Sequence, residues 1–589
     1  MPFWIRSTRD LSTRTRIIFV SVLVLITILL LQPYHHILPS TPFSSISSTS
    51  GNDLKIEVDS ASRPPSSAVE AEGWKGYYPM EDVSTIHEGA INQERPKRVA
   101  IVGAGASGTS AAFFLRRAAR VVERRLGLNE GNLLGEIVVF EKEGYVGGRS
   151  TVVYPHGDER LRWQELGGSI FVDANKNMMR AAKHFNLTLI DPSYGQAGLG
   201  VWDGTQFLFT TSGSDSTTSN WLDSAKALWR YGPLSPMRTK SAVKSLVDRF
   251  LRLYDPVYMR QRGAVSSVED FAENLELGNE YTTRTGEDWA HTVVKVGDKW
   301  LREIMGGSTR VNYATDIHQI HALGAGVSMA TSGASQIEGG NYQVFRNMLD
   351  ASGATVHLGT EITDIIPLNK ADEPPLFHVQ SNKTEINDEE PFDAVFFAAP
   401  WGSSRISKKI AREFDRPIPS QPYVHLHVTY LTTSQPHPQP SFFGLPEGSF
   451  IPNMIITASS PKGSAIPPAR FQSISWHGET YPGSKEYAVK IFSLTRLNER
   501  FLLELLGEEP SWLLRKEWDS YPKLRPINAY APVQPMNGFH YLAAQEAWVS
   551  TMETQTISGR EAVARTVREW WGLGLGECED GESWEWTCS

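Results

Sequence analysis

The fold is decided by one stretch near the start of the globular sequence, Val99-Ala100-Ile101-Val102-Gly103-Ala104-Gly105-Ala106-Ser107-Gly108. Its apolar residues predict a buried strand, and the Gly-x-Gly-x-x-Gly turn predicts a helix that begins near Ser107. We expect Gly103 to permit a tight turn, Gly105 to let the backbone approach a pyrophosphate, and Gly108 to let the helix pack on the strand. The free N–H groups at such a helix start favour phosphate. Taken alone, the motif is also compatible with an ordinary flexible turn.

A second apolar strand, predicted over residues 137–140, ends at Glu141, where a carboxylate can accept hydrogen bonds from both ribose hydroxyls of an adenosine. The spacing from Gly103 is longer than usual, and we interpret the charged residues 120–135 as a longer helix and a surface loop. Gly147-Gly148-Arg149 follows at once. Its glycines permit close backbone approach, and its arginine suits a pyrophosphate.

This order of strand, glycine turn, helix, strand, acid and Gly-Gly-Arg resembles the FAD-binding half of the glutathione-reductase-like flavoproteins, particularly their amine-oxidase-like branch. The resemblance implies bound FAD rather than exchangeable NAD. It implies an α/β fold, in which a Rossmann-like, doubly wound FAD-binding domain is built from discontinuous segments and an α+β domain binds the substrate. The residues expected to bind the cofactor are Gly103, Gly105, Ser107, Gly108, Glu141, Lys142, Gly148, Arg149, Gly168, Ser169, Ile362, Glu553, Ser558 and Gly559.

Later segments extend this prediction. Residues 165–171 resemble the segment that passes close to the flavin in this group. A helix is expected to begin near residues 554–560, where its N-terminus would stabilise negative charge on the pyrimidine end of a reduced flavin, although a plain packing helix is the alternative. The strands at residues 355–358 and 394–397 are expected to return to the first sheet, and residues 400–534 to form a second, mostly antiparallel sheet.

A chain of 589 residues suits two or three domains. The predicted segments are an N-terminal signal anchor or signal peptide (1–38), a Ser/Pro-rich disordered stalk (39–94), the first FAD-domain segment (95–175), a helical substrate-domain segment (176–329), the second FAD-domain segment (330–402), the sheet segment of the substrate domain (403–534), the C-terminal helix of the FAD domain (535–575) and a cysteine-containing tail (576–589).

The N-terminus has the pattern of a targeting sequence. Arg6, Arg9, Arg14 and Arg16 precede a mostly apolar run over residues 17–31, which is typical of a secretory signal or a signal anchor. Since no convincing small-x-small cleavage site follows, we favour an uncleaved, single-pass type II anchor with its N-terminus in the cytosol.

The cysteines and sequons agree with a lumenal body. The chain has two cysteines, Cys578 and Cys588, for which a disulfide in an oxidising compartment is expected. Asn186 and Asn382 begin glycosylation sequons. The net charge of −9, without a basic tract beyond the extreme N-terminus, argues against a nucleic-acid partner.

Two other classes of chemistry lack support. His318-x-x-His321 and His425-x-His427 have the spacing of metal ligands, but the sequence shows no cysteine or acidic partner set for either pair, so no metal is expected. A hydrolase is disfavoured because no Gly-x-Ser-x-Gly elbow lies near a plausible His and Asp.

Further stretches, taken in order, resemble the prenylcysteine oxidase (prenylcysteine lyase) family, namely residues 229–232, 310–313, 316–317, 324–328, 338–341 and 553–560. With the glycine motif, the resemblance covers roughly residues 98–571. It implies an FAD-dependent thioether oxidase that uses oxygen to cleave farnesyl- or geranylgeranylcysteine to cysteine, an isoprenoid aldehyde and hydrogen peroxide, in a lysosome or vacuole, during breakdown of prenylated proteins. The chain departs from the family in its anchor and stalk, the insertion before Glu141 and the Trp/Cys-bearing tail, which puts localisation and substrate range in question.

An isoprenoid needs a long apolar pocket, to which the helical stretch 241–254 contributes unless it is simply core. Residues 338–341 are the main candidate beside the flavin, and an ordinary turn that starts the next helix is the alternative. Because naming a general base requires geometry, the sequence identifies no catalytic residue. The substrate-binding candidates are Tyr231, Tyr313, Glu338 and Asn341.

Two alternatives use the same scaffold. One is an amine oxidase or isoprenoid desaturase, although the sequence has no cysteine before the helix at Ser558 that would carry a covalent flavin. The other is a non-catalytic prenyl-binding protein that resembles the Rab GDP-dissociation inhibitors. The complete glycine motif, with Glu141 and Arg149, argues against a protein without flavin.

Overall fold

The computed structural model describes residues 86, 93–192, 198–213, 217–368, 373–384, 390–460 and 469–588. The chain divides into two units after Lys75, and every described residue belongs to the second. The predicted anchor lies outside the described residues, as does nearly all of the predicted stalk. Within the described part of the chain, no helix has both the length and the apolar character needed to span a membrane.

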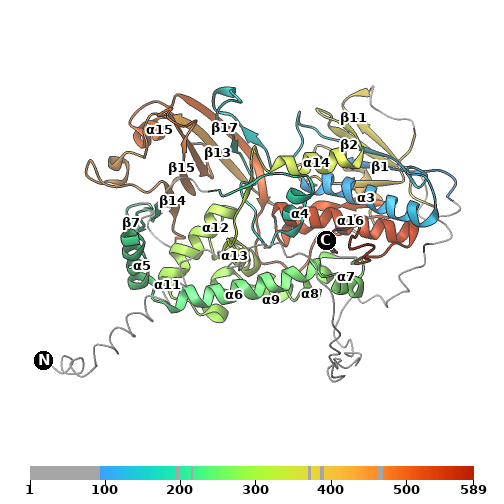
Figure 1. The fold of residues 1–589 in the computed structure, drawn as a ribbon, viewed down its shortest axis with the longest axis horizontal. Helices are drawn as coiled ribbons and strands as arrows, with labels where there is room; N and C mark the ends of the chain where they lie inside the picture. Colours follow the sequence, from blue (N-terminus) through green and yellow to red (C-terminus); the bar gives the residue numbers. More distant parts are fainter. Residues whose placement is uncertain are drawn as a thin grey trace, which may run out of the picture. The chain divides into compact units, whose positions relative to one another are not determined.

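A five-stranded parallel sheet carries the glycine motif (Figure 1). Its strands, in the order β18-β12-β1-β2-β9, are β18 (Phe539–Tyr541), β12 (Ala394–Phe397), β1 (Lys97–Val102), β2 (Leu134–Phe140) and β9 (Thr355–His357). Residues 99–102 of β1 and all of β12 are apolar and mostly buried, as expected of a sheet covered on both faces. The prediction that late strands return to the first sheet is confirmed, and the domain is built from discontinuous segments.

Three helices cover the parallel sheet: α3 (Ala106–Leu126), α14 (Tyr342–Ser352) and α16 (Met552–Trp571). Helix α3 packs against both of the others. It is the longer helix expected before Glu141, and a surface loop joins it to β2. Two glycines permit this packing. A Cβ on Gly108 would lie 2.0 Å from the carbonyl oxygen of Gly103, and one on Gly559 would lie 2.4 Å from Oγ of Ser110.

A second, seven-stranded sheet has the order β17-β13-β16-β15-β14-β6-β7. Its strands are β6 (Leu199–Trp202), β7 (Phe207–Thr210), β13 (Tyr423–Thr433), β14 (Met454–Thr457), β15 (Ser473–Glu479), β16 (Tyr487–Ser493) and β17 (Trp512–Pro522). The sheet is mostly antiparallel, as predicted, with one parallel pair, β6 and β14.

The prediction that residues 176–329 are helical is wrong for β6 and β7, because strands this short show no clear period. Smaller elements are β3 (Val152–Val153), β4 (Gln164–Glu165), β5 (Leu189–Ile190), β8 (Gln336–Ile337), β10 (Ile362–Pro367), β11 (Phe377–Ser381) and α15 (Glu499–Leu506).

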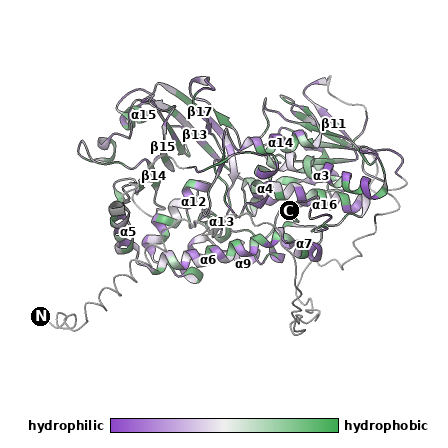
Figure 2. Ribbon diagram, in the orientation of Figure 1, coloured by the Kyte–Doolittle hydropathy of each residue, from purple (hydrophilic) through white to green (hydrophobic). Residues whose placement is uncertain are grey.

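A helical layer completes the second domain below this sheet in Figure 1. Its main helix is α6 (Leu234–Phe250), which corresponds to the predicted helical stretch at residues 241–254. Figure 2 shows hydrophobic and hydrophilic residues in alternation along α6, as expected of an amphipathic helix. The other helices of this layer are α5 (Thr217–Tyr231), α7 (Pro256–Arg262), α8 (Val268–Asn274), α9 (Asn279–Thr282), α10 (Gly286–Trp289), α11 (Asp298–Trp300), α12 (Gly306–Tyr313) and α13 (Ala322–Ser328). Helix α4 (Lys176–His184) packs instead against α14 and α16.

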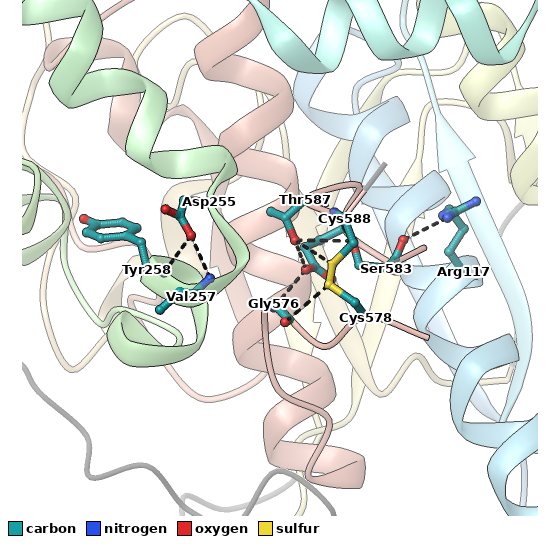
Figure 3. The surroundings of a disulfide bond; sticks show 10 residues. Arg117, Asp255, Val257, Tyr258, Gly576, Cys578, Ser583, Thr587 and Cys588 are labelled. Carbon is teal, nitrogen blue, oxygen red and sulfur yellow. Dashed lines mark hydrogen bonds between the residues drawn. A yellow bond between two sulfur atoms is a disulfide. The ribbon is translucent and has the colours of Figure 1, made fainter. Parts of the chain in front are cut away.

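The C-terminal residues pack onto α3. Cys578 and Cys588 form the predicted disulfide (Figure 3). Trp584 and Trp586 are buried against aromatic rings of α3, and Arg117 on that helix donates hydrogen bonds to backbone carbonyls of this segment. The C-terminal segment therefore shields one side of α3 from solvent.

Replacing Gly108 by alanine tests the packing of α3. We expect Gly108→Ala to lower the free energy of unfolding by about 3 kcal/mol, because the new methyl group must displace the backbone of Gly103. Denaturant unfolding measures the loss. Gly105→Ala is the matched control, since its Cβ meets nothing closer than 3.9 Å. Equal stability of Gly108→Ala and Gly105→Ala would contradict the packing argument.

Candidate functional site

One cavity of about 1130 Å³ connects the two domains. The glycine turn after β1, the end of β2 and the Gly-Gly-Arg segment line one end. Helices α6, α12 and α13 line another part, and strands of the second sheet contribute a third wall. The first residues of α16 also line it, so the predicted helix N-terminus does face the cavity.

The glycine end is shaped for an anionic backbone. Gly105 forms a bridge with Gly147, and a Cβ on Gly148 would lie 3.2 Å from Cα of Gly105. Helix α3 begins at the cavity without a side-chain cap and without an acid in its first turn. The free N–H groups and the positive end of this helix lie beside two loops whose glycines let the backbone come close to a ligand. This arrangement fits a pyrophosphate.

Glu141 lies beside this turn and is buried. Its Oε2 accepts a hydrogen bond from N–H of Ala104 at 2.8 Å, and its Oε1 accepts one from N–H of Glu143 at 2.9 Å. Burial raises the pKa of Glu141, and these two hydrogen bonds oppose that shift. The carboxylate is fixed at the cavity wall and keeps further lone pairs for ligand hydroxyls. This arrangement fits the ribose of an adenine dinucleotide.

Arg149 lines the same cavity but is held by the protein. Its guanidinium forms an ion pair with Glu546 and donates to the carbonyl of Ser520 at 2.7 Å. The hydroxyl of Tyr423 donates to the same glutamate at 2.9 Å. Arg149 therefore ties the Gly-Gly-Arg segment to the residues around β17, in addition to any pyrophosphate contact.

The structure brings most of the predicted cofactor residues to the cavity wall. They are Gly103, Gly105, Ser107, Glu141, Lys142, Gly148, Arg149, Gly168, Ser169, Ile362 and Glu553. Glu553 also caps α4, because its carboxylate accepts hydrogen bonds from N–H of Asn177 and of Met178.

Three predicted cofactor residues do not line the cavity. Gly108 and Gly559 serve the packing of α3, since their missing side chains let β1 and α16 approach that helix. Ser558 donates a hydrogen bond to the carbonyl of Leu542 at 2.6 Å. The packing role of Gly108 is the one that the glycine motif predicts, whereas nothing in the sequence separates packing from binding for Ser558 and Gly559.

Of the predicted substrate-binding residues, some line the cavity and others do not. Tyr313 lines the cavity. Tyr231 does not, because its hydroxyl donates to Glu303 at 2.9 Å and its ring packs on Trp300. Glu338 is exposed outside the cavity.

Asn341 is fully buried just behind the cavity wall. Its N–H donates to Oε1 of Glu165 at 2.7 Å, and its Nδ2 donates to the carbonyl of Gly168 at 2.9 Å. Asn341 therefore positions the segment 165–171, which was predicted to pass the flavin, rather than contacting a ligand directly.

Lys490 is a cavity residue that sequence reasoning missed. It lies on β16, is buried, and donates from Nζ to the carbonyl of Glu165 at 2.7 Å and to Oγ of Ser169 at 3.0 Å. Burial lowers the pKa of Lys490 to about 7, and burial raises the pKa of the Glu165 carboxyl to about 8. The available signal was a lysine at an inward position of an otherwise apolar strand.

The helical part of the cavity is apolar. Val243, Leu246, Val247 and Phe250 of α6 line it, with Leu323 and Val327 of α13. The sequence left open whether the stretch 241–254 contributes to a pocket or only to the core. The structure shows that the inner face of α6 lines the cavity. A polar end and an apolar end in one cavity suit a dinucleotide and a second ligand with a long hydrocarbon part.

His425 and His427 have acidic neighbours that the sequence analysis did not foresee. Strand β17 pairs with β13 so that Glu517 lies opposite His427 and Asp519 lies opposite His425. Acidic partners that are far away in the sequence therefore do complete this group.

The fold and the site define a Rossmann-type dinucleotide-binding protein with a second domain that closes a shared cavity. A model for the NAD(P)-binding Rossmann-like domain matches residues 101–185. The model for prenylcysteine lyase matches residues 214–575, which is more than half of the chain, and the chain belongs to the prenylcysteine lyase family.

Curated relatives agree with this assignment. The chain is 28% identical over 492 residues to farnesylcysteine lyase of Arabidopsis thaliana, covering 81% of this chain and 89% of that protein. It is 28% identical over 499 residues to prenylcysteine oxidase 1 of Homo sapiens, covering 82% and 92%. Among solved structures, putrescine oxidase bound to putrescine matches with 16% identity and a TM-score of 0.48, over 80% of this chain and 99% of that one.

Removal of the Glu141 carboxylate tests the dinucleotide site. We expect Glu141→Ala to weaken dinucleotide binding by about tenfold to a hundredfold, because two backbone N–H groups and the ligand hydroxyls lose their acceptor. Titration of the apoprotein with FAD measures the affinity. Glu143→Ala, at the neighbouring and more exposed acid, is the control. Equal affinities of both variants would remove Glu141 from the site.

Proposed function

We propose that the protein is an FAD-dependent oxidase that cleaves prenyl-L-cysteine, such as farnesyl- or geranylgeranylcysteine, to cysteine, an isoprenoid aldehyde and hydrogen peroxide. The observation that carries the proposal is the single cavity in which a dinucleotide cradle adjoins an apolar channel. Family membership supports it, as do relatives named for farnesylcysteine and prenylcysteine.

FAD fits the residues present. The turn at Gly105 and Gly148 and the start of α3 would hold its pyrophosphate, Glu141 would hold the ribose, and the start of α16 would face the pyrimidine end of its ring, where the reduced flavin carries negative charge. When bound, FAD supplies hydride acceptance from the carbon beside the sulfur and electron transfer to oxygen.

The reaction balances with water as a reactant. The carbon beside sulfur loses two electrons, and dioxygen gains them to become hydrogen peroxide. Water adds its oxygen to the oxidised carbon, the carbon–sulfur bond breaks, and cysteine leaves as a thiol. The protein has to bind the chain, place this carbon and remove one proton from the attacking water.

Lys490 has the properties of that proton acceptor. A neutral lysine amine has two N–H donors and one lone pair, and its two donors match the two oxygens at Glu165 and Ser169. The lone pair then remains for a water in the cavity. Asn341 supports this geometry, since it holds the Glu165 side chain and the Gly168 carbonyl.

The apolar residues of α6 and α13 would take the isoprenoid. Burial of each methylene contributes about 0.8 kcal/mol, so a farnesyl or geranylgeranyl chain supplies most of the binding energy. Tyr313, whose ring packs edge-on against Tyr521, lies on the same wall.

For localisation, we propose the lumen of the secretory pathway and delivery to a lysosome or vacuole, with residues 17–31 as a membrane anchor. The disulfide between Cys578 and Cys588 supports an oxidising compartment. Asn186, which begins one of the two sequons, is exposed.

Substrate selection tests the proposed activity. We expect farnesylcysteine to yield peroxide, cysteine and farnesal in equal amounts, whereas an S-alkyl cysteine without the allylic double bond reacts far more slowly, because the double bond stabilises the developing cation. Assays of peroxide and of free thiol measure the turnover of both compounds. Oxidation of simple amines without turnover of farnesylcysteine would favour an amine oxidase. Prenyl binding without flavin would favour a non-catalytic prenyl-binding protein.

The pH profile tests Lys490. We expect kcat to rise as pH increases through about 7, because the amine accepts a proton only when neutral. Lys490→Met should remove this limb and lower kcat by about a hundredfold or more. Lys516→Met, at another cavity lysine, should keep the limb. A Lys490→Met enzyme with the unchanged profile would exclude this role.

A further inference from the structure

The paired strands β13 and β17 bring two histidines and two acids together on one face of the second sheet. His425 and His427 are two residues apart on β13, so their side chains share a face. Glu517 lies opposite His427 and Asp519 lies opposite His425. Ligand atoms of His425, His427 and Glu517 all lie within 4.8 Å of one another.

The separations between the two ring nitrogens and the Glu517 oxygens match those of neighbouring metal ligands. Nδ1 of His427 is 3.4 Å from Oε1 of Glu517, and Nε2 of His425 is 3.6 Å from its Oε2. Zinc bonds of about 2.0–2.1 Å to nitrogen and oxygen place neighbouring ligands of a tetrahedron roughly 3.4 Å apart.

Asp519 supplies a further feature of metal sites. Its Oδ1 lies 3.3 Å from Nδ1 of His425, on the opposite side of the ring from the nitrogen that faces Glu517. Histidines that bind metals usually donate their second ring N–H to a carboxylate or carbonyl, which fixes the tautomer and the ring orientation. Asp519 is placed to do this for His425.

We propose that His425 Nε2, His427 Nδ1 and the Glu517 carboxylate form a zinc site with an open fourth position, and that Asp519 orients His425. Three protein ligands with an open position are typical of zinc sites that also bind water or a ligand. His425, Glu517 and Asp519 line the large cavity, so the metal lies at its wall. His425 and Glu517 are exposed enough for an ion to enter.

Titration with Zn²⁺ alone tests the site, on the full-length chain without a polyhistidine tag. We expect His427→Ala to bind one zinc ion fewer than the unmodified chain. Asp519→Asn should keep the stoichiometry and weaken the affinity about tenfold to a hundredfold, which a merely structural aspartate would not do. Co²⁺ absorption should report tetrahedral coordination in the unmodified chain and lose that signal in His427→Ala.

Two controls keep the test decisive. His378→Ala removes an unrelated histidine of β11, and a double substitution, His35→Ala with His36→Ala, removes a rival pair near the N-terminus. Both should retain the zinc ion. Loss of zinc in the His35/His36 variant with retention in His427→Ala would overturn the proposal, as would absence of saturable binding by the unmodified chain. Because all variants are compared for thermal unfolding, lost binding through misfolding is recognised.

Discussion

The structure depends on the close packing of α3 between the parallel sheet and α16. The helix approaches β1 where Gly108 has no side chain, and it approaches α16 where Gly559 has none. A single methyl group at either place would meet backbone or side-chain atoms at about 2 Å. This packing fixes the start of α3 beside Gly103 and Gly105, and it also brings the first residues of α16 to the same cavity. Two helix N-termini therefore face one ligand site, which favours a pyrophosphate beside α3 and negative charge on a flavin ring beside α16.

The second domain places a buried lysine and an apolar surface beside the cavity wall that the Rossmann-like domain forms. Its sheet presents Lys490 to the segment 165–171, and Asn341 holds that segment from behind. Burial favours the neutral forms of Lys490 and Glu165, which makes proton transfer feasible near neutral pH. Its helical layer supplies apolar residues for a hydrocarbon chain. The two domains together explain how one cavity holds a charged cofactor and a lipid-like substrate.

Local sequence patterns were sufficient for the dinucleotide half of the site. The glycine turn, Glu141 and the Gly-Gly-Arg segment are close in the chain, and their spacing follows directly from strand and helix geometry. Sequence patterns did not predict the contacts that form when segments far apart in the chain pair with each other. Glu517 reaches His427 only through the register of β13 and β17, and Lys490 reaches Ser169 across more than half of the chain. Neither of these two contacts is visible as a repeating pattern of residues in the sequence. Ser558, Gly559 and Tyr231 lie in stretches that resemble the family, but none of them lines the cavity, and their contacts are with other parts of the protein.

The absorbance spectrum of the purified full-length protein, recorded before and after anaerobic addition of farnesylcysteine, tests the central claim most directly. The account predicts an oxidised flavin spectrum that bleaches when the thioether is added and returns when oxygen is admitted. A flavin that stays oxidised with farnesylcysteine would contradict the assignment of the substrate. A protein that neither contains nor takes up FAD would contradict the assignment of the site itself.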